Sequence, residues 1–148
     1  METIVVGVDG SEGAAAALEF AAAEAALRKA RLRIVSAWEL PAMVYTGGFA
    51  PPLDAEALAA FRVRAQHVAD DALATVKELQ PSLEGEALAV EGHPAGVLLE
   101  QAAGADLVIV GNRGLGGFKS LLLGSVSQQI VHHATCPVVV VREPVTPS

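Results

Sequence analysis

The feature that most constrains this chain is a glycine-rich stretch between two apolar runs. Residues 107–110 read Leu-Val-Ile-Val, and glycines then recur before Ser125, at Gly111, Gly114, Gly116, Gly117 and Gly124. A helix-like segment, Ser125–His133, leads into a second apolar run, Val138–Val141. This order predicts a strand, a glycine loop, a helix and another strand, which is the unit of an α/β fold with a parallel sheet.

The glycine loop is suited to binding an anion. Glycine has no side chain, so another group can come close to its backbone. A helix that begins near Gly124 and Ser125 directs unpaired N–H groups, and the positive end of its dipole, back toward the loop. Ser125 adds a hydroxyl donor, and Arg113 and Lys119 add positive charge. The stretch indicates a cradle for a nucleotide phosphate, although glycine loops in α/β folds also serve only as tight turns.

Two widespread nucleotide-binding patterns do not match this loop. The pattern G-x-x-x-x-G-K-[ST] would end at Lys119 and Ser120, but Phe118 stands where it requires glycine. The pattern G-x-G-x-x-G fits at Gly114 and Gly116 and then meets Lys119 instead of glycine. The loop is therefore neither an ordinary P-loop nor a dinucleotide fingerprint.

A longer pattern does match. Gly111-x-x-Gly114, nine further residues and then Gly124-Ser125 resemble G-2x-G-9x-G-(S/T), the signature of the ATP-binding branch of the universal stress protein family. Residues 4–11, Ile-Val-Val-Gly-Val-Asp-Gly-Ser, look like the first strand of that family and its Asp-bearing turn. Residues 133–141 look like its last strand, so the resemblance covers essentially the whole chain as a single copy.

The resemblance implies a ligand and a site. It implies ATP, with Mg²⁺ or Mn²⁺ bridging the phosphates, since phosphate-bound Mg²⁺ needs few protein ligands. The residues expected to contact the nucleotide are Val8, Asp9, Ala37, Val110, Gly111, Arg113, Gly114, Gly124, Ser125, Val126 and Ser127. No side chain is expected to be catalytic. A nucleotide-dependent regulatory role in the stress response is favoured; slow ATP hydrolysis, or nucleotide-free action through protein contacts, are the alternatives, and AMP remains open as the resident ligand.

The rest of the chain alternates between strand and helix patterns. Strands are expected at 3–8, 32–38, 86–91, 107–110 and 138–141, and helices at 14–30, 55–79, 95–103 and 125–133. The alternation predicts a three-layer, Rossmann-like α/β fold, in which a five-stranded, mainly parallel sheet carries helices on both faces. The resemblance adds the strand order 3-2-1-4-5. One domain is expected over residues 1–143, with a loose tail over 144–148.

Several side chains near the predicted strand ends have competing interpretations. Asp9 would lie at the carboxyl end of the first strand, where open α/β sheets bind ligands. Asp9 or Ser11 could instead cap the next helix, but the resemblance favours Asp9 as a contact of base, ribose or bound metal. Trp38 is expected in the core or at a rim, and His93 in a turn or capping role.

Two further segments allow functional hypotheses. Residues 39–53 contain Pro41, Pro51 and Pro52 and an adjacent pair of glycines, so we expect a long loop that covers the nucleotide. In this loop, Tyr45 and Phe49 would either contact the ligand or pack against the protein. The group His132, His133 and Cys136 is weak as a metal site, because zinc sites use more ligands in recognisable pairs.

Composition narrows the classes of partner. A net charge of −7 does not suit general binding to nucleic acid, and the chain has no apolar run long enough to span a membrane. The single cysteine and the start METIVVGVDG favour a cytoplasmic protein. Val138–Val141 would be an exposed sheet edge, and the resemblance implies that a second subunit pairs with it to form a homodimer.

Overall fold

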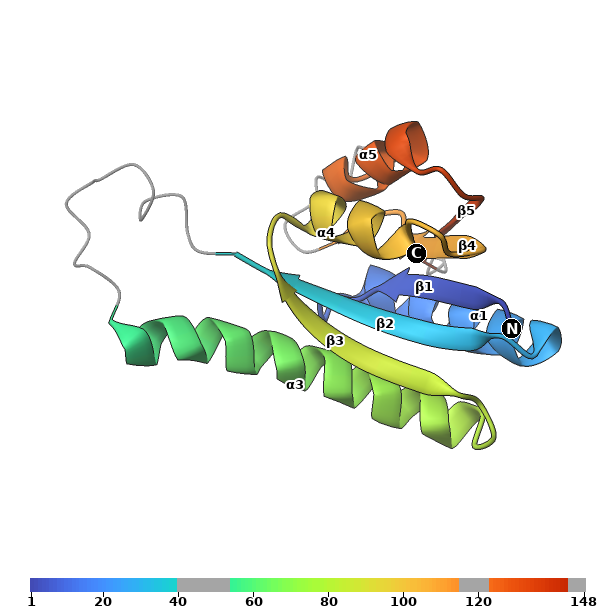
Figure 1. Ribbon diagram of the computed structural model, residues 1–148, viewed down its shortest axis with the longest axis horizontal. Helices are drawn as coiled ribbons and strands as arrows, with labels where there is room; N and C mark the ends of the chain where they lie inside the picture. Colours follow the sequence, from blue (N-terminus) through green and yellow to red (C-terminus); the bar gives the residue numbers. More distant parts are fainter. Residues whose placement is uncertain (40–53, 115–122, 144–148) are drawn as a thin grey trace, which may run out of the picture.

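Five parallel strands form the centre of the molecule. The computed structural model describes residues 1–39, 54–114 and 123–143. The strands are β1 (Thr3–Gly7), β2 (Arg31–Trp38), β3 (Gly85–Glu91), β4 (Leu107–Gly111) and β5 (Val138–Val141). They lie side by side in the order β3-β2-β1-β4-β5, and every neighbouring pair is parallel (Figure 1). The predicted fold class and strand order are confirmed.

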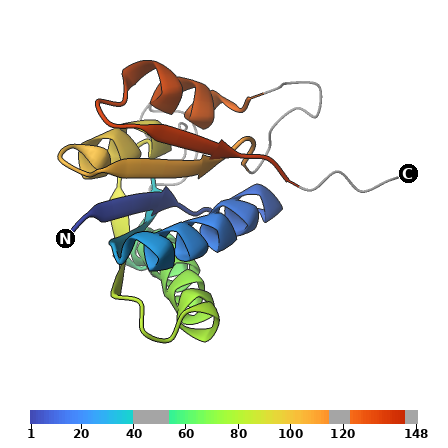
Figure 2. The ribbon, with the colours of Figure 1, turned by 90° about the vertical axis from the view of Figure 1, so that its right-hand side faces the viewer.

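In the described part of the chain, four helices connect the strands across the two faces of the sheet. They are α1 (Glu12–Arg28), α3 (Ala55–Leu79), α4 (Pro94–Ala102) and α5 (Ser125–His133). Figure 1 shows α3 running along β2 and β3, with α4 and α5 toward the β4 and β5 end of the sheet. Figure 2 shows α1 running alongside the central strands. Because all strands are parallel, their carboxyl ends meet at one edge of the sheet, where ligands of open α/β sheets bind.

The core has one hydrophobic layer on each face of the sheet. Ile4 and Val6 of β1 pack with the buried faces of α1 and α3, whereas Val5 packs with α4 and α5. Strand side chains alternate between faces, so a strand buried on both faces reads as a continuous apolar run. This is why the runs at β1 and β4 were recognisable in the sequence.

Capping residues set where the helices begin. The Ser11 side chain accepts a hydrogen bond from the N–H of Ala14 at 3.1 Å, and Asp54 accepts one from Ala57 at 2.8 Å. Asp54 is thus the N-cap residue of α3. The helix predicted at 14–30 begins earlier, at Glu12, because Ser11 is its cap. It also ends earlier, because Lys29 turns into the left-handed region at φ 54°.

The long helix α3 departs from its sequence pattern at one end. Ala65, Ala72 and Val76 recur at helical spacing and are buried, but Leu79 is 47% exposed at the last position of the helix. His67, off this stripe, is exposed. Within the described ranges, no helix is long and apolar enough to cross a membrane.

Candidate functional site

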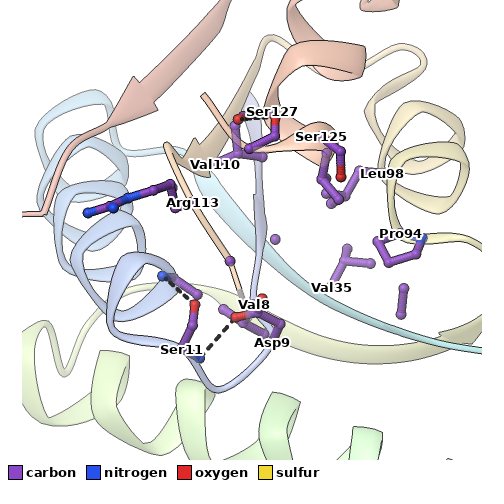
Figure 3. Close-up of a pocket in the computed structure, with 17 residues that line it drawn as sticks. Val8, Asp9, Ser11, Val35, Pro94, Leu98, Val110, Arg113, Ser125 and Ser127 are labelled. Carbon is purple, nitrogen blue, oxygen red and sulfur yellow. Dashed lines mark hydrogen bonds between the residues drawn. The ribbon is translucent and has the colours of Figure 1, made fainter. Parts of the chain in front are cut away.

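A cavity of about 470 Å³ opens at the carboxyl ends of β1, β2 and β4. Its walls come from these strand ends and from the starts of α1, α4 and α5 (Figure 3). Every residue expected to contact a nucleotide lines it, namely Val8, Asp9, Ala37, Val110, Gly111, Arg113, Gly114, Gly124, Ser125, Val126 and Ser127. The structure brings these residues together; their contact with a nucleotide stays a prediction.

The turn after β1 shows which of Asp9 and Ser11 caps the next helix. Ser11 caps α1, and Asp9 Oδ1 accepts a hydrogen bond from the N–H of Ser11 at 2.9 Å. Asp9 therefore shapes the turn, and Gly10 supplies the φ of +85° that the turn requires. The second carboxylate oxygen, Oδ2, faces Gly114, where an added Cβ would stand only 2.6 Å away. Gly114 is thus needed for the close approach of the Asp9 carboxylate.

The start of α1 and the turn after β4 meet backbone against backbone. A Cβ on Gly111 would stand 2.6 Å from the carbonyl oxygen of Gly13, and a Cβ on Gly13 would overlap the carbonyl oxygen of Arg113. Real Cβ atoms do not come this close to backbone. Two cavity walls therefore touch only because neither glycine has a side chain. Sequence reasoning missed Gly13, whose one signal is a glycine within the first turn of an otherwise alanine-rich helix.

The N-terminus of α5 presents backbone donors to the cavity. Gly124 is the N-cap residue, and no side chain caps the helix. The N–H of Gly124 itself donates to the carbonyl oxygen of Asn112 at 2.6 Å. It is therefore already paired and is not one of the unpaired N–H groups expected near Gly124 and Ser125. The amides of Ser125, Val126 and Ser127 have no acceptor among residues 1–39, 54–114 and 123–143. Unpaired amides at a helix N-terminus favour a bound anion.

Positive charge contributes less to this cavity than the sequence suggested. Arg113 lines the cavity, but Figure 3 shows its guanidinium extending away from Asp9 and Ser125, on the side of α1. Lys119, the other predicted cation, lies outside the described residues. In the described part of the chain, the cavity attracts anions mainly through the backbone of α5.

The opposite end of the cavity is apolar. Val35 and Ala37 of β2 line it together with Pro94 and Leu98 of α4, and Figure 3 shows Val35 beside Pro94. Gly7 belongs to the same wall, because a Cβ there would stand 2.8 Å from a methyl group of Leu98. Sequence reasoning missed Gly7, Val35, Pro94 and Leu98 as lining residues, since apolar residues in strands and helices read equally well as core. An apolar slot beside unpaired amides suits a flat ring that carries an anionic group.

Trp38 and His93 lie outside the cavity lining. Trp38 borders a separate hollow of about 190 Å³ with Ala55, Leu58, Ala59 and Arg62 of α3, in keeping with a rim position. His93 occupies the N-cap position of α4, as expected for a turn, but its side chain makes no capping hydrogen bond. Its Nδ1 instead lies 3.8 Å from Oε1 of Glu39. The expected covering loop, with Tyr45 and Phe49, and the expected tail at 144–148 lie outside the described residues.

Metal-binding side chains do not cluster in the described part of the chain. There, no three His, Cys, Asp or Glu side chains gather closely enough to hold an ion. The rings of His132 and His133 are 6.4 Å apart and tilted. Burial raises the pKa of the Cys136 thiol above its usual value, so it is not an activated thiolate.

Comparison with known proteins identifies the family. The model of the universal stress protein family matches residues 1–142. The chain belongs to this family. A universal stress protein of Thermus aquaticus is 42% identical over 143 residues, which cover 95% of this chain and 98% of the relative. A universal stress protein of Mycobacterium tuberculosis is 35% identical over 140 residues, and this chain spans only 45% of its length.

Solved structures of the family share the fold. The universal stress protein UspA from Lactobacillus plantarum superposes with a TM-score of 0.75 at 25% identity, over 95% of this chain and 97% of that one. A universal stress protein crystallised in complex with cAMP superposes with a TM-score of 0.68 at 29% identity, over 97% of this chain and 98% of that one.

Replacing Gly13 tests the backbone contact between α1 and the turn after β4. Gly13→Ala should destabilise the protein by about 1–3 kcal/mol, because its methyl group must displace the carbonyl of Arg113. The matched control is Gly96→Ala in α4, where a Cβ meets open space and should stabilise by about 0.5–1 kcal/mol. Urea unfolding followed by circular dichroism measures both. A Gly13→Ala protein as stable as the original would contradict the contact.

Proposed function

We propose that this universal stress protein binds ATP in the cavity at the carboxyl ends of β1, β2 and β4, and that ATP occupancy regulates its role in the stress response. The observation that carries the proposal is the N-terminus of α5, whose amides at Ser125, Val126 and Ser127 open onto this cavity. The cavity volume of about 470 Å³ falls within the range of small-molecule sites. The relative solved with cAMP supports an adenine nucleotide as the ligand class.

The two ends of the cavity suit the two ends of a nucleotide. The phosphates would lie against the first turn of α5, beside the glycine turn at Gly111 and Gly114. The adenine would lie between Ala37 and Pro94, in the apolar slot. This arrangement leaves the ribose close to Asp9. The net charge of −7 does not prevent the phosphates from binding, because the amide dipoles act at contact distance whereas distant surface charges are screened by salt.

A divalent cation fits this site only as a partner of the phosphates. The available oxygen donors are the carboxylate of Asp9 and the hydroxyls of Ser11 and Ser125, and one carboxylate oxygen of Asp9 is already engaged by an N–H. Mg²⁺ and Mn²⁺ bind well to phosphate oxygens with few protein ligands. We therefore propose that Mg²⁺ or Mn²⁺ enters with ATP and neutralises its phosphates.

Rapid ATP hydrolysis is not part of the proposal. Phosphoryl transfer needs a residue that orients water and cations that neutralise the transferred group. Of the side chains considered for this, Asp9 accepts a hydrogen bond from its own turn, His93 lies beside Glu39 outside the lining, and Lys119 lies outside the described residues. The Arg113 guanidinium extends away from Asp9 and Ser125. ATP would thus be held as a regulatory ligand, with slow turnover at most.

Substitutions at Gly124 test the phosphate position. Asp and Asn are favoured N-cap residues whose side chains accept hydrogen bonds from the first-turn amides, so they would compete with phosphate while helping α5 to fold. Gly124→Asp should weaken ATP binding at least tenfold, or about 1.4 kcal/mol, since it also adds a negative charge. Gly124→Asn should weaken it less, and Gly124→Ala least, because alanine cannot cap.

Isothermal titration calorimetry with ATP measures this series. The control is the unmodified protein, analysed also for nucleotide released on denaturation after purification. Undiminished affinity in Gly124→Asp would overturn the site. A protein that binds no ATP and releases no nucleotide would instead support action through protein contacts alone.

We also propose a homodimer formed through β5. This strand of four valines stands at the end of the sheet, and no described strand pairs with its outer side. On the β4 side, the N–H of Val108 donates to the carbonyl of Pro137, and the N–H of Asn112, which follows β4, donates to the carbonyl of Val141. Because parallel ladders use alternate residues, the N–H groups of Val138 and Val140 point to the open edge. A second copy of β5 would satisfy them and cover the valines.

Val140→Pro tests this pairing. Proline removes the outward N–H without removing a donor to β4 and is tolerated at sheet edges, so it should convert the dimer to a monomer. Val140→Ala is the control, since it keeps the N–H and should stay dimeric. Size-exclusion chromatography with light scattering gives the masses. A Val140→Pro protein that remains dimeric would contradict pairing through β5.

A further inference from the structure

Ser127 lines the cavity, but its side chain is buried and hydrogen-bonded within the protein. Ser127 is only 2% exposed. Its hydroxyl oxygen lies 3.1 Å from the carbonyl oxygen of Asn112 and 3.0 Å from that of Gly124. The hydroxyl has one proton, so it donates to one of these carbonyls at a time. The bond therefore ties the first turn of α5 either to Asn112, which follows β4, or to Gly124, the N-cap residue.

Asn112 is a firm anchor for this tie. It follows β4 directly, and its N–H donates to the carbonyl of Val141 in β5 at 2.9 Å. Its own carbonyl accepts the N–H of Gly124 at 2.6 Å as well as the Ser127 hydroxyl. The peptide group before Asn112 is therefore bonded to β5, and the carbonyl after it holds the start of α5, so Asn112 links the position of α5 to the sheet.

In the described part of the chain, no other side-chain hydrogen bond holds the first turn of α5, although Val126 also packs against the core there. The N-cap residue is Gly124, which offers no capping side chain, and the hydroxyl of Ser125 is on the exposed side of the helix. The amides of Ser125 and Val126 can hold a phosphate only if this turn stays in place. Preorganised donors bind more tightly, because the ligand does not bear the cost of ordering them.

We propose that Ser127 is a positioning residue for the phosphate group: its side chain touches no ligand and instead fixes the direction of the α5 amides. This inference rests on the proposed function. The inference predicts different effects at the two ends of the cavity. The apolar end is built by β2 and α4, which have no part in the hydrogen bond between Ser127 and Asn112. Loss of the Ser127 hydroxyl should weaken the binding of phosphate and leave the binding of the nucleoside unchanged.

The experiment compares ATP with adenosine in the full-length protein. Calorimetry gives the affinity of the original protein for each, and then that of S127A. S127A should bind ATP about three- to tenfold more weakly, which corresponds to one lost hydrogen bond. Its affinity for adenosine should stay within about twofold of the original, since the lost bond lies at the other end of the cavity. A purely structural role would weaken both ligands by the same factor.

Two further variants keep the test decisive. S127T retains the hydroxyl and should bind ATP more tightly than S127A, whereas S127C keeps the volume with a weaker donor and should fall between them. If S127A does not fold, the comparison of S127C with S127T replaces it. Gln129→Ala, an exposed change on the same helix, is the control and should bind ATP as the original protein does.

The outcomes separate the two proposals. An equal loss for ATP and adenosine, or no loss for ATP in S127A, would overturn the positioning role while the proposed function stands. Failure of the original protein to bind ATP would overturn the proposed function and this inference with it. A loss confined to ATP, restored in S127T, is the result that supports the positioning role.

Discussion

Close contact between bare backbone segments is the constraint on which the cavity depends. Gly13 at the start of α1 touches the turn after β4, and Gly111 and Gly114 let that turn approach α1 and the Asp9 carboxylate. A side chain at Gly13 or Gly111 would meet backbone and force the walls apart, and one at Gly114 would displace the Asp9 carboxylate. Because interiors are close-packed, such a displacement would be transmitted to the neighbouring strand ends. The glycines are therefore explained first by the packing of the walls, and only then by access to a ligand.

The two ends of the site rely on different parts of the fold. At the polar end, the N-terminus of α5 is held on the end of β4 through the carbonyl of Asn112. At the apolar end, β2 and α4 provide small and apolar side chains, and the neighbouring turns are joined by a hydrogen bond from Gly92 N–H to the carbonyl of Trp38 at 2.8 Å. A ligand with an anionic end and a flat apolar end would engage both halves, and its binding would stabilise the folded protein by mass action.

Much of this architecture could be predicted from the sequence, for identifiable reasons. Strands buried on both faces produce continuous apolar runs, so β1 and β4 were evident, and glycines at set spacing located one wall of the cavity. The remaining features leave weaker marks. Val35 and Leu98 have the apolar side chains of ordinary core residues, so the sequence does not mark them as cavity lining. The hydrogen bond from Gly124 N–H to the carbonyl of Asn112 joins two backbone groups, so no residue type indicates it. The direction of the Arg113 side chain depends on packing that spacing does not encode.

The central claim is that the first turn of α5 receives the phosphates of ATP. The most direct measurement is an ATP titration of the ¹⁵N-labelled protein, followed through its backbone amide resonances, with adenosine titrated in parallel. The account predicts that the amides of Ser125, Val126 and Ser127 shift strongly with ATP and little with adenosine, because only a phosphate reaches them. Strong ATP-induced shifts that leave these amides unmoved would contradict it.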